Sequence, residues 1–403
     1  MNTPKIRFKG FTDDWEQRKL GEIVLRESLA RESTIDLPYV EYEDVIAEEG
    51  RINKDIRKKE GIKKGIFFDG SQVLYGKLRP YLHNWLNPDF SGVAVGDWWV
   101  LKPNNVDKNF IYRLIQTQQF DDIANQSTGS KMPRADWNLV SNTEFAIPTS
   151  QVEQTKIGGY FSTLDNLITL HQRKCDETKQ LKKFMLQKMF PKNGEKNPEI
   201  RFEGFTDDWE QRKFGELAEY KKGPFGSAIT KDMFVPKNDE SVKVYEQQNA
   251  INKDWSLERY FLPKEYALTK LKSFEVHGGD IIVSCAGTIG EIYEIPDNAD
   301  SGVINQALMR VRVNECIVDK KMFIIVFSNM IDEFTRTHGN GSAIKNIPPF
   351  ADLKPMEVLI PSIDEQKKLR EHFSSLDNLI TLHQRKCEKL KELKKFMLQN
   401  MFV

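Results

Sequence analysis

The sequence has few cysteines and no long apolar run. Four cysteines in 403 residues, at positions 175, 285, 316 and 387, are too few for a disulfide scaffold and too far apart for a CxxC metal pair, so we expect reduced, mostly buried thiols. No apolar run is long enough to cross a membrane, and the N-terminus is polar throughout. We therefore expect a soluble, cytoplasmic protein without a membrane partner, long enough for two or three globular domains.

The sequence also lacks net charge, because 59 basic residues balance 59 acidic ones. A protein that binds nucleic acid alone usually has a basic excess, since neutralisation of phosphates supplies much of the affinity. If this chain contacts DNA, we expect partner subunits to provide part of the phosphate contacts.

What the sequence does contain is an internal duplication. IRFKGFTDDWEQRK at 6–19 returns as IRFEGFTDDWEQRK at 200–213, with 13 of 14 residues identical. A longer segment at 161–190 returns at 373–402, with 24 of 30 residues identical. The regions between the repeats have diverged almost beyond alignment. The order is therefore a short motif, a variable region and a long segment, and then all three again.

Both long segments have helical periodicity. Apolar residues recur at alternating steps of three and four, which predicts a coiled-coil seam about three heptads long. About 38 residues at 1.5 Å each make a rod of ~57 Å, which needs a partner helix to cover its apolar stripe. We expect the two helices to pair antiparallel about a pseudo-two-fold axis, with the first short motif beside the end of the second helix, in a cyclic layout. The helix-seam residues are Phe161, Leu164, Ile168, His171 and Cys175 in the first copy, and Phe373, Leu376, Ile380, His383 and Cys387 in the second.

Three features of the repeats admit more than one interpretation. At the equivalent positions His171 and His383 we expect packing rather than a metal site or a pH switch, because no HxxxH or CxxC motif accompanies them. Leu167 and Leu170, with their equivalents in the second copy, widen the apolar stripe, so we expect each helix to bury a second face. The paired aspartates of the short motif are expected to cap helix starts rather than to form a metal or acid-base dyad.

The two variable regions, 22–150 and 217–360, have a mixed pattern. β-branched and aromatic residues indicate strands, and other stretches have the spacing of amphipathic helices. This mixture predicts an α+β fold. The expected strands lie within 72–78, 93–102, 280–295 and 307–313, and the expected helices within 109–126 and 320–337.

Polar loops in both variable regions carry groups that read base edges and phosphates. Arg and Lys suit guanine, Asn and Gln suit adenine, and a Gly-Ser turn lets the backbone approach phosphate. A polar loop is by default a solvated loop, so only the duplicated scaffold favours a DNA-binding role for these residues. The candidate DNA-binding residues are Lys77, Arg79, Tyr81, His83, Asn84, Lys131 and Arg134 in the first region, and Ser227, Gln247, Gln248, Asn249, Asn340 and Lys345 in the second.

Catalytic motifs are absent or broken. A methyltransferase that modifies base amino groups needs Asn or Asp directly before Pro-Pro-Tyr/Phe, and here Ile347 separates Asn346 from Pro348. The segment Gly70–Gly76 has one residue too many for a Walker loop, and neither HExxH nor GxSxG occurs. A loose nuclease spacing around Asp297 is of a kind that arises by chance. We therefore expect no catalytic site and no metal site.

In its duplicated layout and in several motifs, the sequence resembles the DNA specificity subunit of type I restriction-modification enzymes. The resemblance covers essentially the whole chain and implies an α+β fold, with two globular target recognition domains separated by two long antiparallel coiled-coil helices. The implied divisions are a recognition domain at 1–150, a helix and linker at 151–197, a second recognition domain at 198–360 and a helix at 361–403. The motifs that carry the resemblance are GKLRPYL at 76–82, GDIIVSCAGTIGEI at 279–292, INQALMRVR at 304–312, GSAIKNIPPF at 341–350, IPSIDEQKKL at 360–369 and the two FSxLDNLITLHQRK segments.

The resemblance implies a non-catalytic role. Each recognition domain would read one half of an interrupted site in double-stranded DNA, the helices would set the distance between the halves, and two methyltransferase subunits would dock on the repeated surfaces. Restriction subunits would join the full complex. No cofactor is expected in this chain, since S-adenosylmethionine, ATP and Mg²⁺ would bind the partner subunits.

Two other classes of function are compatible with parts of the sequence. One is an adaptor that binds proteins and not DNA, which the neutral charge favours and the polar loops disfavour. The other is an autonomous modification enzyme, which the broken Asn-Pro-Pro-Phe pattern disfavours.

Overall fold

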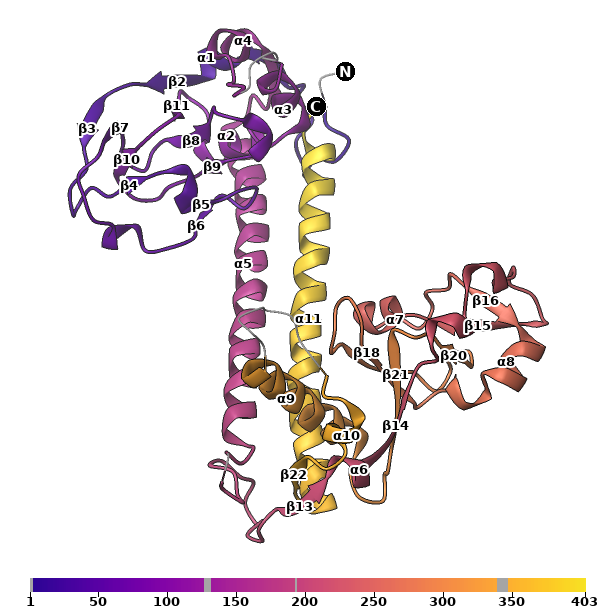
Figure 1. The fold of residues 1–403 in the computed structure, drawn as a ribbon. Coiled ribbons are helices and arrows are strands. Elements are labelled where there is room, and N and C mark those ends of the chain that lie inside the picture. The colour runs from indigo at the N-terminus through magenta and orange to yellow at the C-terminus, as the bar shows by residue number, and fades with distance from the viewer. Residues whose placement is uncertain (1–2, 127–131, 193, 339–346) are drawn as a thin grey trace. The chain divides into compact units, whose positions relative to one another are not determined.

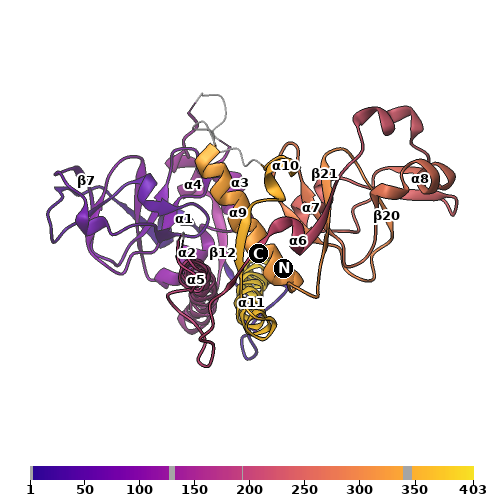
Figure 2. The ribbon, with the colours of Figure 1, turned by 60° about the horizontal axis from the view of Figure 1, so that its bottom comes forward.

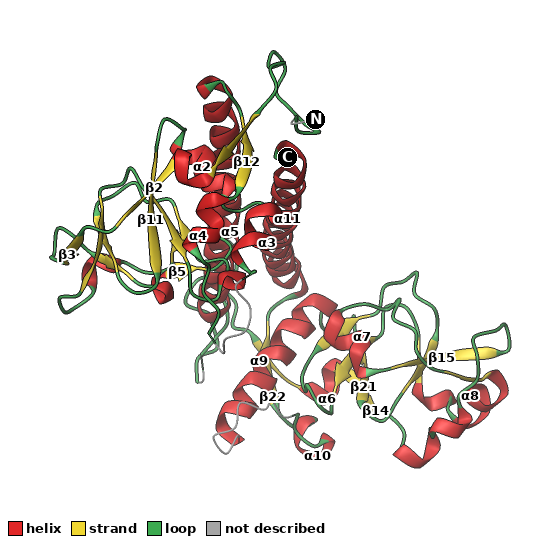
Figure 3. Ribbon diagram, turned by 90° about the horizontal axis from the view of Figure 1, so that it is seen from above, coloured by secondary structure: helices red, strands yellow, loops and turns green. Residues whose placement is uncertain are grey.

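The computed structural model describes residues 3–126, 132–192, 194–338 and 347–403. Helices and strands occur throughout both halves (Figure 3), which confirms the α+β class. The chain forms two compact units: the first unit comprises residues 1–177 and 379–403, and the second unit comprises residues 178–378. Within the described ranges, no helix is both long enough and apolar enough to cross a membrane.

The first unit is built on two four-stranded sheets (Figure 1). One sheet is antiparallel throughout, and the other contains one parallel pair, β10 with β4. Short helices cover the first sheet, and their apolar side chains share one core with its strands. The first sheet has the order β2 (Val24–Glu27), β11 (Trp98–Pro103), β8 (Val73–Gly76), β9 (Trp85–Leu86); the second has β3 (Ala30–Glu32), β7 (Lys64–Phe68), β10 (Gly92–Ala94), β4 (Tyr39–Val40).

The second unit repeats the antiparallel sheet and three strands of the other sheet, whose fourth strand, β16, pairs at the opposite edge from β3. Its antiparallel sheet has the same order of equivalent strands, and its other sheet again contains one parallel pair, β15 with β20. The variable regions therefore share an architecture that their sequences no longer show. The strands are β14 (Ala218–Lys222), β21 (Leu308–Val313), β18 (Ile281–Ser284) and β19 (Ile292–Glu294) in one sheet, and β16 (Phe261–Pro263), β15 (Ser241–Tyr245), β20 (Gly302–Ile304) and β17 (Glu275–Val276) in the other.

Helix α9 (Lys320–His338) covers the core of the second unit beside the start of α11, at Ile363 (Figure 2). The helix expected within 109–126 is two helices in the structure, because the side chain of Thr117 accepts the backbone N–H of Phe120 and starts a new helix there. The short helices of the first unit are α1 (Leu20–Ile23), α2 (Lys108–Leu114), α3 (Gln118–Ala124) and α4 (Trp137–Asn142), and those of the second are α6 (Phe214–Leu217), α7 (Gln247–Asn252), α8 (Lys264–Lys270) and α10 (Phe350–Leu353).

The short repeated motif leads into a strand in both copies. β1 (Glu16–Lys19) pairs with β12 (Glu144–Ile147), and β13 (Glu210–Lys213) pairs with β22 (Glu357–Ile360) in the same antiparallel way. The expectation that the paired aspartates cap a helix was wrong, because a strand follows them and α1 begins only at Leu20.

The cyclic layout is confirmed by two equivalent joints. In the second unit, the N–H of Ile200 donates to the carbonyl of Lys188, 2.9 Å away, at the end of the first long helix. In the first unit, the N–H of Ile6 donates to the carbonyl of Asn400, also at 2.9 Å, at the end of the second long helix. Each motif is also fixed by a buried ion pair, Arg7 with Glu153 at 2.6 Å and Arg201 with Glu365 at 2.8 Å.

The long helices are α5 (Gln151–Lys188), with 38 residues, and α11 (Ile363–Met401), with 39. Within the first unit, Asp165 of α5 pairs with Lys394 of α11 at 2.8 Å, and His171 meets His383 further along. Within the second unit, the equivalent pair is Lys182 with Asp377 at 2.6 Å. Residue numbers rise along one helix as they fall along the other, so the helices pair antiparallel within each unit.

The predicted seam positions are all buried or half-buried, and Phe161, Phe373 and both cysteines are nearly inaccessible. The expectation of a second buried face was wrong at three of the four positions, whereas Leu170 is half-buried. Leu167, Leu379 and Leu382 are 38%, 42% and 45% exposed. An apolar period predicts that a helix face is covered, but it does not show whether the same chain or a partner covers it.

We expect the first unit to lose stability as the pH falls below about 6.5, the ordinary pKa of His. The Nδ1 atoms of His171 and His383 lie 3.0 Å apart, so they share one proton at most. Burial, then the charges of His383, Lys386 and Lys174, lower the pKa of His171. Because the unfolded chain then binds the proton more readily, the free energy of unfolding is greatest above pH 6.5 and decreases as the pH falls through the folded pKa.

Thermal denaturation of the full chain between about pH 8 and pH 5 measures this effect. A variant carrying His171→Gln and His383→Gln should show a flatter dependence in that range. An unchanged slope in the variant would show that other groups control it.

Candidate nucleic-acid interface

The β8–β9 loop of the first unit, residues 77–84, is an anchored and strained segment. The N–H of Gly76 donates to the carbonyl of Asn84 at 2.7 Å, and the N–H of Arg79 donates to the carbonyl of Pro133 at 2.8 Å. Arg79 and His83 have φ values of 50° and 51°, a left-handed conformation that costs a residue other than glycine of the order of 1 kcal/mol. The surrounding bonds hold this loop in one shape, which presents Tyr81 with 52% of its surface exposed.

Two cations gather around Asp97 beside this loop. Arg134 donates to both carboxylate oxygens of Asp97 at 3.3 and 3.1 Å, and Lys77 lies 3.5 Å away. Burial would raise the pKa of Asp97, but these two cations outweigh burial and hold it below its ordinary value of 3.8. Asp97 therefore stays ionised and orients both cations, whose outer atoms remain accessible.

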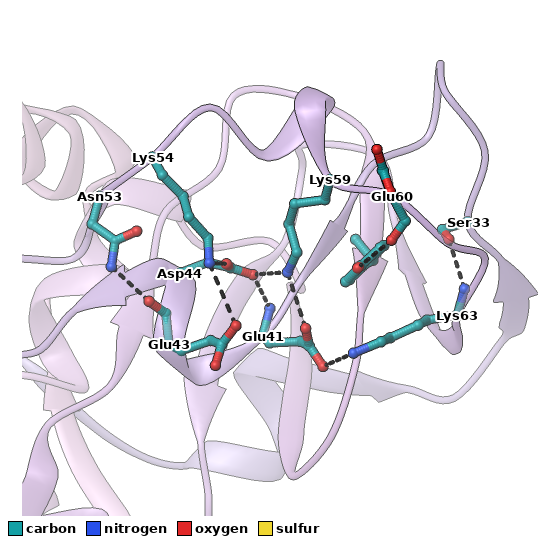
Figure 4. A network of polar contacts seen from close by, with 10 residues as sticks. Ser33, Glu41, Glu43, Asp44, Asn53, Lys54, Lys59, Glu60 and Lys63 are labelled. Carbon is teal, nitrogen blue, oxygen red and sulfur yellow. Dashed lines mark hydrogen bonds and ion pairs between the residues drawn. The ribbon is translucent and has the colours of Figure 1, made fainter.

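A charged network fixes the segment Glu41–Asp44 next to the same loop (Figure 4). Asp44 is fully buried and accepts hydrogen bonds from Lys59 at 2.6 Å and from the N–H of Glu41 at 2.7 Å. Burial opposes its ionisation, but these bonds lower the pKa of Asp44 below its ordinary value. The segment carries Tyr42, whose hydroxyl accepts the N–H of Leu78 at 3.1 Å. The network thus ties Tyr42 to the β8–β9 loop.

Two candidate DNA-binding residues of the first variable region, His83 and Asn84, interact with or are buried by other residues of the protein. His83 lies 2.9 Å from Asp121 and stacks on Trp85, with 5.2 Å between ring centroids. Asn84 is only 7% exposed, which corrects its assignment as a residue that contacts bases. Lys131 lies outside the described residues.

The second unit presents α7 at the position where the first unit has Tyr42. α7 and the segment Glu41–Asp44 begin with the same capping box. The side chains of Glu246 and Asn249 each accept a hydrogen bond from the backbone N–H of the other residue, as those of Glu41 and Asp44 do. Asn249 is 2% exposed and donates to the carbonyls of Asp254 and Leu257, so its assignment to base reading is corrected as well. The burial of Asn249 could not be predicted from the sequence, because its capping role depends on the fold.

Gln248 of α7 is exposed, and Gln247 lies against the loop that joins β18 to β19. This β18–β19 loop, residues 285–291, occupies the place that 77–84 occupies in the first unit. The Oε1 atom of Gln247 is buried without a hydrogen-bond partner. Ser227 is exposed in a single 3₁₀ turn after β14. Asn340 and Lys345 lie outside the described residues.

Sequence reasoning missed the β18–β19 loop, because it gave the whole of 280–295 the character of strands. The signal was present in the glycines: Gly287 and Gly290 have φ values of 62° and 84°, as expected at a turn. The N–H of Cys285 donates to the carbonyl of Ala307 at 2.7 Å, which joins this loop to the residue just before β21.

Two units that share an antiparallel sheet and most of a second sheet, with equivalent loops after β8 and β18, define a duplicated protein. Comparison with known families identifies it further. The family model of the type I restriction modification DNA specificity domain matches residues 12–180 and 206–392, and the chain belongs to this family. It is a DNA-recognition component of a type I restriction-modification system and not its catalytic part.

Individual relatives are distant in sequence. The chain is 23% identical over 300 residues to the specificity subunit of the type I restriction enzyme MjaVIII from Methanocaldococcus jannaschii, covering 72% of this chain and 68% of the relative. The solved type I restriction-modification S subunit from M. genitalium shares the fold with a TM-score of 0.59 at 12% identity, covering 100% of this chain and 99% of that one. A solved chain from work on the assembly and conformational transition of the type I R-M system has a TM-score of 0.57 at 15% identity, covering 95% and 96%.

Proposed function

We propose that each unit reads one half of an interrupted DNA site, and that α5 and α11 set the distance between the two halves. The observation that supports this most directly is that equivalent loops carry different chemistry. The loop 77–84 contains Lys77, Arg79, Tyr81 and His83, whereas the loop 285–291 contains one charged residue, Glu291, which pairs with Lys253. Cations suit guanine, and the amides of α7 suit adenine, so the two half-sites should differ.

The proposed recognition domains are residues 1–150 and 198–360, joined by the helical segments 151–197 and 361–403. Lys131, Asn340 and Lys345 stay in the proposal on sequence grounds alone. The remaining proposed DNA-contacting residues are Lys77, Arg79, Tyr81, His83 and Arg134 in the first domain, and Ser227, Gln247 and Gln248 in the second.

We further propose that each long helix carries a docking stripe for one methyltransferase subunit. The stripe positions follow one helix face at steps of three and four, and apolar residues occupy both ends of the face. Their exposure leaves apolar surface that a partner would cover. The stripe consists of Leu167, Leu170, Lys174, Glu177, Leu181 and Phe184 on α5, and of Leu379, Leu382, Lys386, Lys389, Leu393 and Phe396 on α11.

Two equivalent stripes support two methyltransferase subunits in each complex, to which restriction subunits bind in turn. In this proposal the chain holds no cofactor: S-adenosylmethionine, ATP and Mg²⁺ act in the partner subunits. The neutral net charge is then explained, because partners that close around the DNA contribute phosphate contacts.

We expect a substitution in one reading loop to change one half-site only. Tyr81→Ala and Gln248→Ala each remove an exposed side chain and leave the core intact. Each should relax base preference at one half-site by about 1–3 kcal/mol, or roughly 5- to 150-fold, and leave the other half unchanged. Mapping methylated sites in the genome of cells that express the variant with its methyltransferase subunit measures both halves at once.

Lys270→Ala, at the end of α8, serves as the control, since it should alter neither half. A single substitution that changed both half-sites would contradict the proposal. So would methylation at a continuous site without a gap.

A further inference from the structure

Phe225 is an exposed aromatic residue on the loop that follows β14. Its side chain is 90% exposed, and no other large apolar side chain in the described ranges is as accessible. The neighbouring Pro224 is buried, so the loop directs one residue into the protein and the next one out of it. Scattered apolar residues on a surface are ordinary, and exposure alone therefore decides nothing.

The loop around Phe225 is held at both ends. On one side, the N–H of Gly223 donates to the carbonyl of Leu308 at 2.8 Å. A Cβ atom at Gly223 would lie 1.8 Å from the carbonyl oxygen of Asn305, so only glycine fits this close approach. On the other side, the N–H of Ala228 donates to the carbonyl of Phe225 at 2.8 Å, and Ile229 is buried. The exposed ring thus belongs to an anchored turn.

The surroundings of Phe225 are those of the proposed reading surface. Gly223 packs on Asn305 and Gln306, which follow β20, and Ala307 of that segment bonds to the β18–β19 loop. Lys222 is exposed, and its charge acts on Cys285: burial raises the pKa of Cys285 to about 11, and Lys222 opposes that rise. Lys222 is the last residue of β14, three residues before Phe225, so a cation lies beside the Phe225 turn, as a surface that contacts phosphate requires.

DNA gives such a residue a defined role. Proteins that deform the duplex insert an apolar side chain between two base pairs, which costs stacking energy and allows closer contact with the groove. Burying the Phe side chain contributes a favourable free energy that offsets that cost. An anchored aromatic residue next to a cation meets both requirements.

We propose that Phe225 enters the base stack of the half-site read by the second unit and opens one base step there. This inference rests on the proposed function, because it assumes that the second unit contacts DNA. It assigns to Phe225 a positioning role: the ring deforms the half-site, and the polar loops read it.

The experiment uses the complete complex with its methyltransferase subunits and duplexes that carry the mapped site, with 2-aminopurine placed in turn along the second half-site. The fluorescence of 2-aminopurine rises when the base loses its stacking. Apart from the base that is methylated, which a methyltransferase extrudes in any case, we expect wild-type protein to raise the fluorescence at one step. Phe225→Ala should abolish that rise and weaken specific binding about 10- to 100-fold. Phe225→Leu, which keeps an apolar side chain, should retain most of both effects. Leu268→Ala, at an apolar residue of α8 that is 48% exposed, should behave as wild type.

The outcomes separate this inference from the proposed function. If wild-type protein binds and methylates its site but no position other than the methylated base brightens, Phe225 does not open the stack and the inference is overturned, while the proposed function stands. If Phe225→Ala releases a methyltransferase subunit, the ring contacts protein and the inference is likewise overturned. If the second half-site proves to depend on no residue of the second unit, both proposals fail together.

Discussion

Phe184→Asp in α5 is expected to remove one methyltransferase subunit from the complex, and Phe396→Asp in α11 to remove the other. The two residues occupy equivalent positions in the repeated segments and are 46% and 52% exposed. Leu181 and Leu393, one turn earlier on the same stripe, are 44% and 40% exposed. Large apolar residues of this kind act as hot spots, whose loss costs about 2–4 kcal/mol, or roughly 30- to 1000-fold in affinity. A buried unpaired carboxylate raises that cost further.

Native mass spectrometry of the purified complex measures this directly. Each single variant should retain one methyltransferase subunit instead of two, and the double variant should retain none. Lys179→Asp is the control, because spacing places Lys179 on the side of α5 away from the stripe, where it is exposed. If either single variant lost both subunits or neither, the two stripes would not be two independent docking sites.

Four residues inserted into both long helices are expected to move methylation to sites with a longer gap. The insertions would follow Lys174 and Lys386, which are equivalent in the repeat. Four residues add ~6 Å and slightly more than one helical turn, so the seam keeps nearly the same direction. One base pair of B-DNA rises ~3.4 Å, and the gap should therefore grow by one or two base pairs, with loss of methylation at the original sites.

The matched control is the same insertion in one helix only. It leaves the two helices unequal, so pairing and assembly should suffer and no new site should appear. Methylation that persisted at the original gap after the double insertion would show that the helices do not set the distance.

The long helices could be predicted from sequence, and the surface that reads DNA could be predicted only in part. The seam has a period that extends over some 38 residues, and a long regular period is the most reliable sequence signal. The cyclic joints followed from the order of the repeats. By contrast, Asn84 and Asn249 have the side-chain chemistry of base-reading residues, but the fold buries both.

The failures have a common physical cause, which is that function and packing use the same residue types. The amide of Asn249 caps and supports a helix, and only the neighbouring carbonyls of Asp254 and Leu257 reveal this. The stripe leucines could not be assigned either, since burial by a partner chain and burial within the chain leave the same period in a sequence. Phe225 carried no motif at all and was identified by its exposure.

The two equivalent joints bear on how such a protein arises. In one unit, covalent continuity carries the backbone from the end of a long helix to Ile200, and in the other a hydrogen bond from Ile6 to Asn400 holds the same arrangement across a break in the backbone. If each unit reads one half-site, as proposed, a gene for one half alone would specify a homodimer whose two identical readers are restricted to palindromes. Fusion of two gene copies lifts that restriction: each reader drifts or recombines by itself, and asymmetric targets become accessible to natural selection.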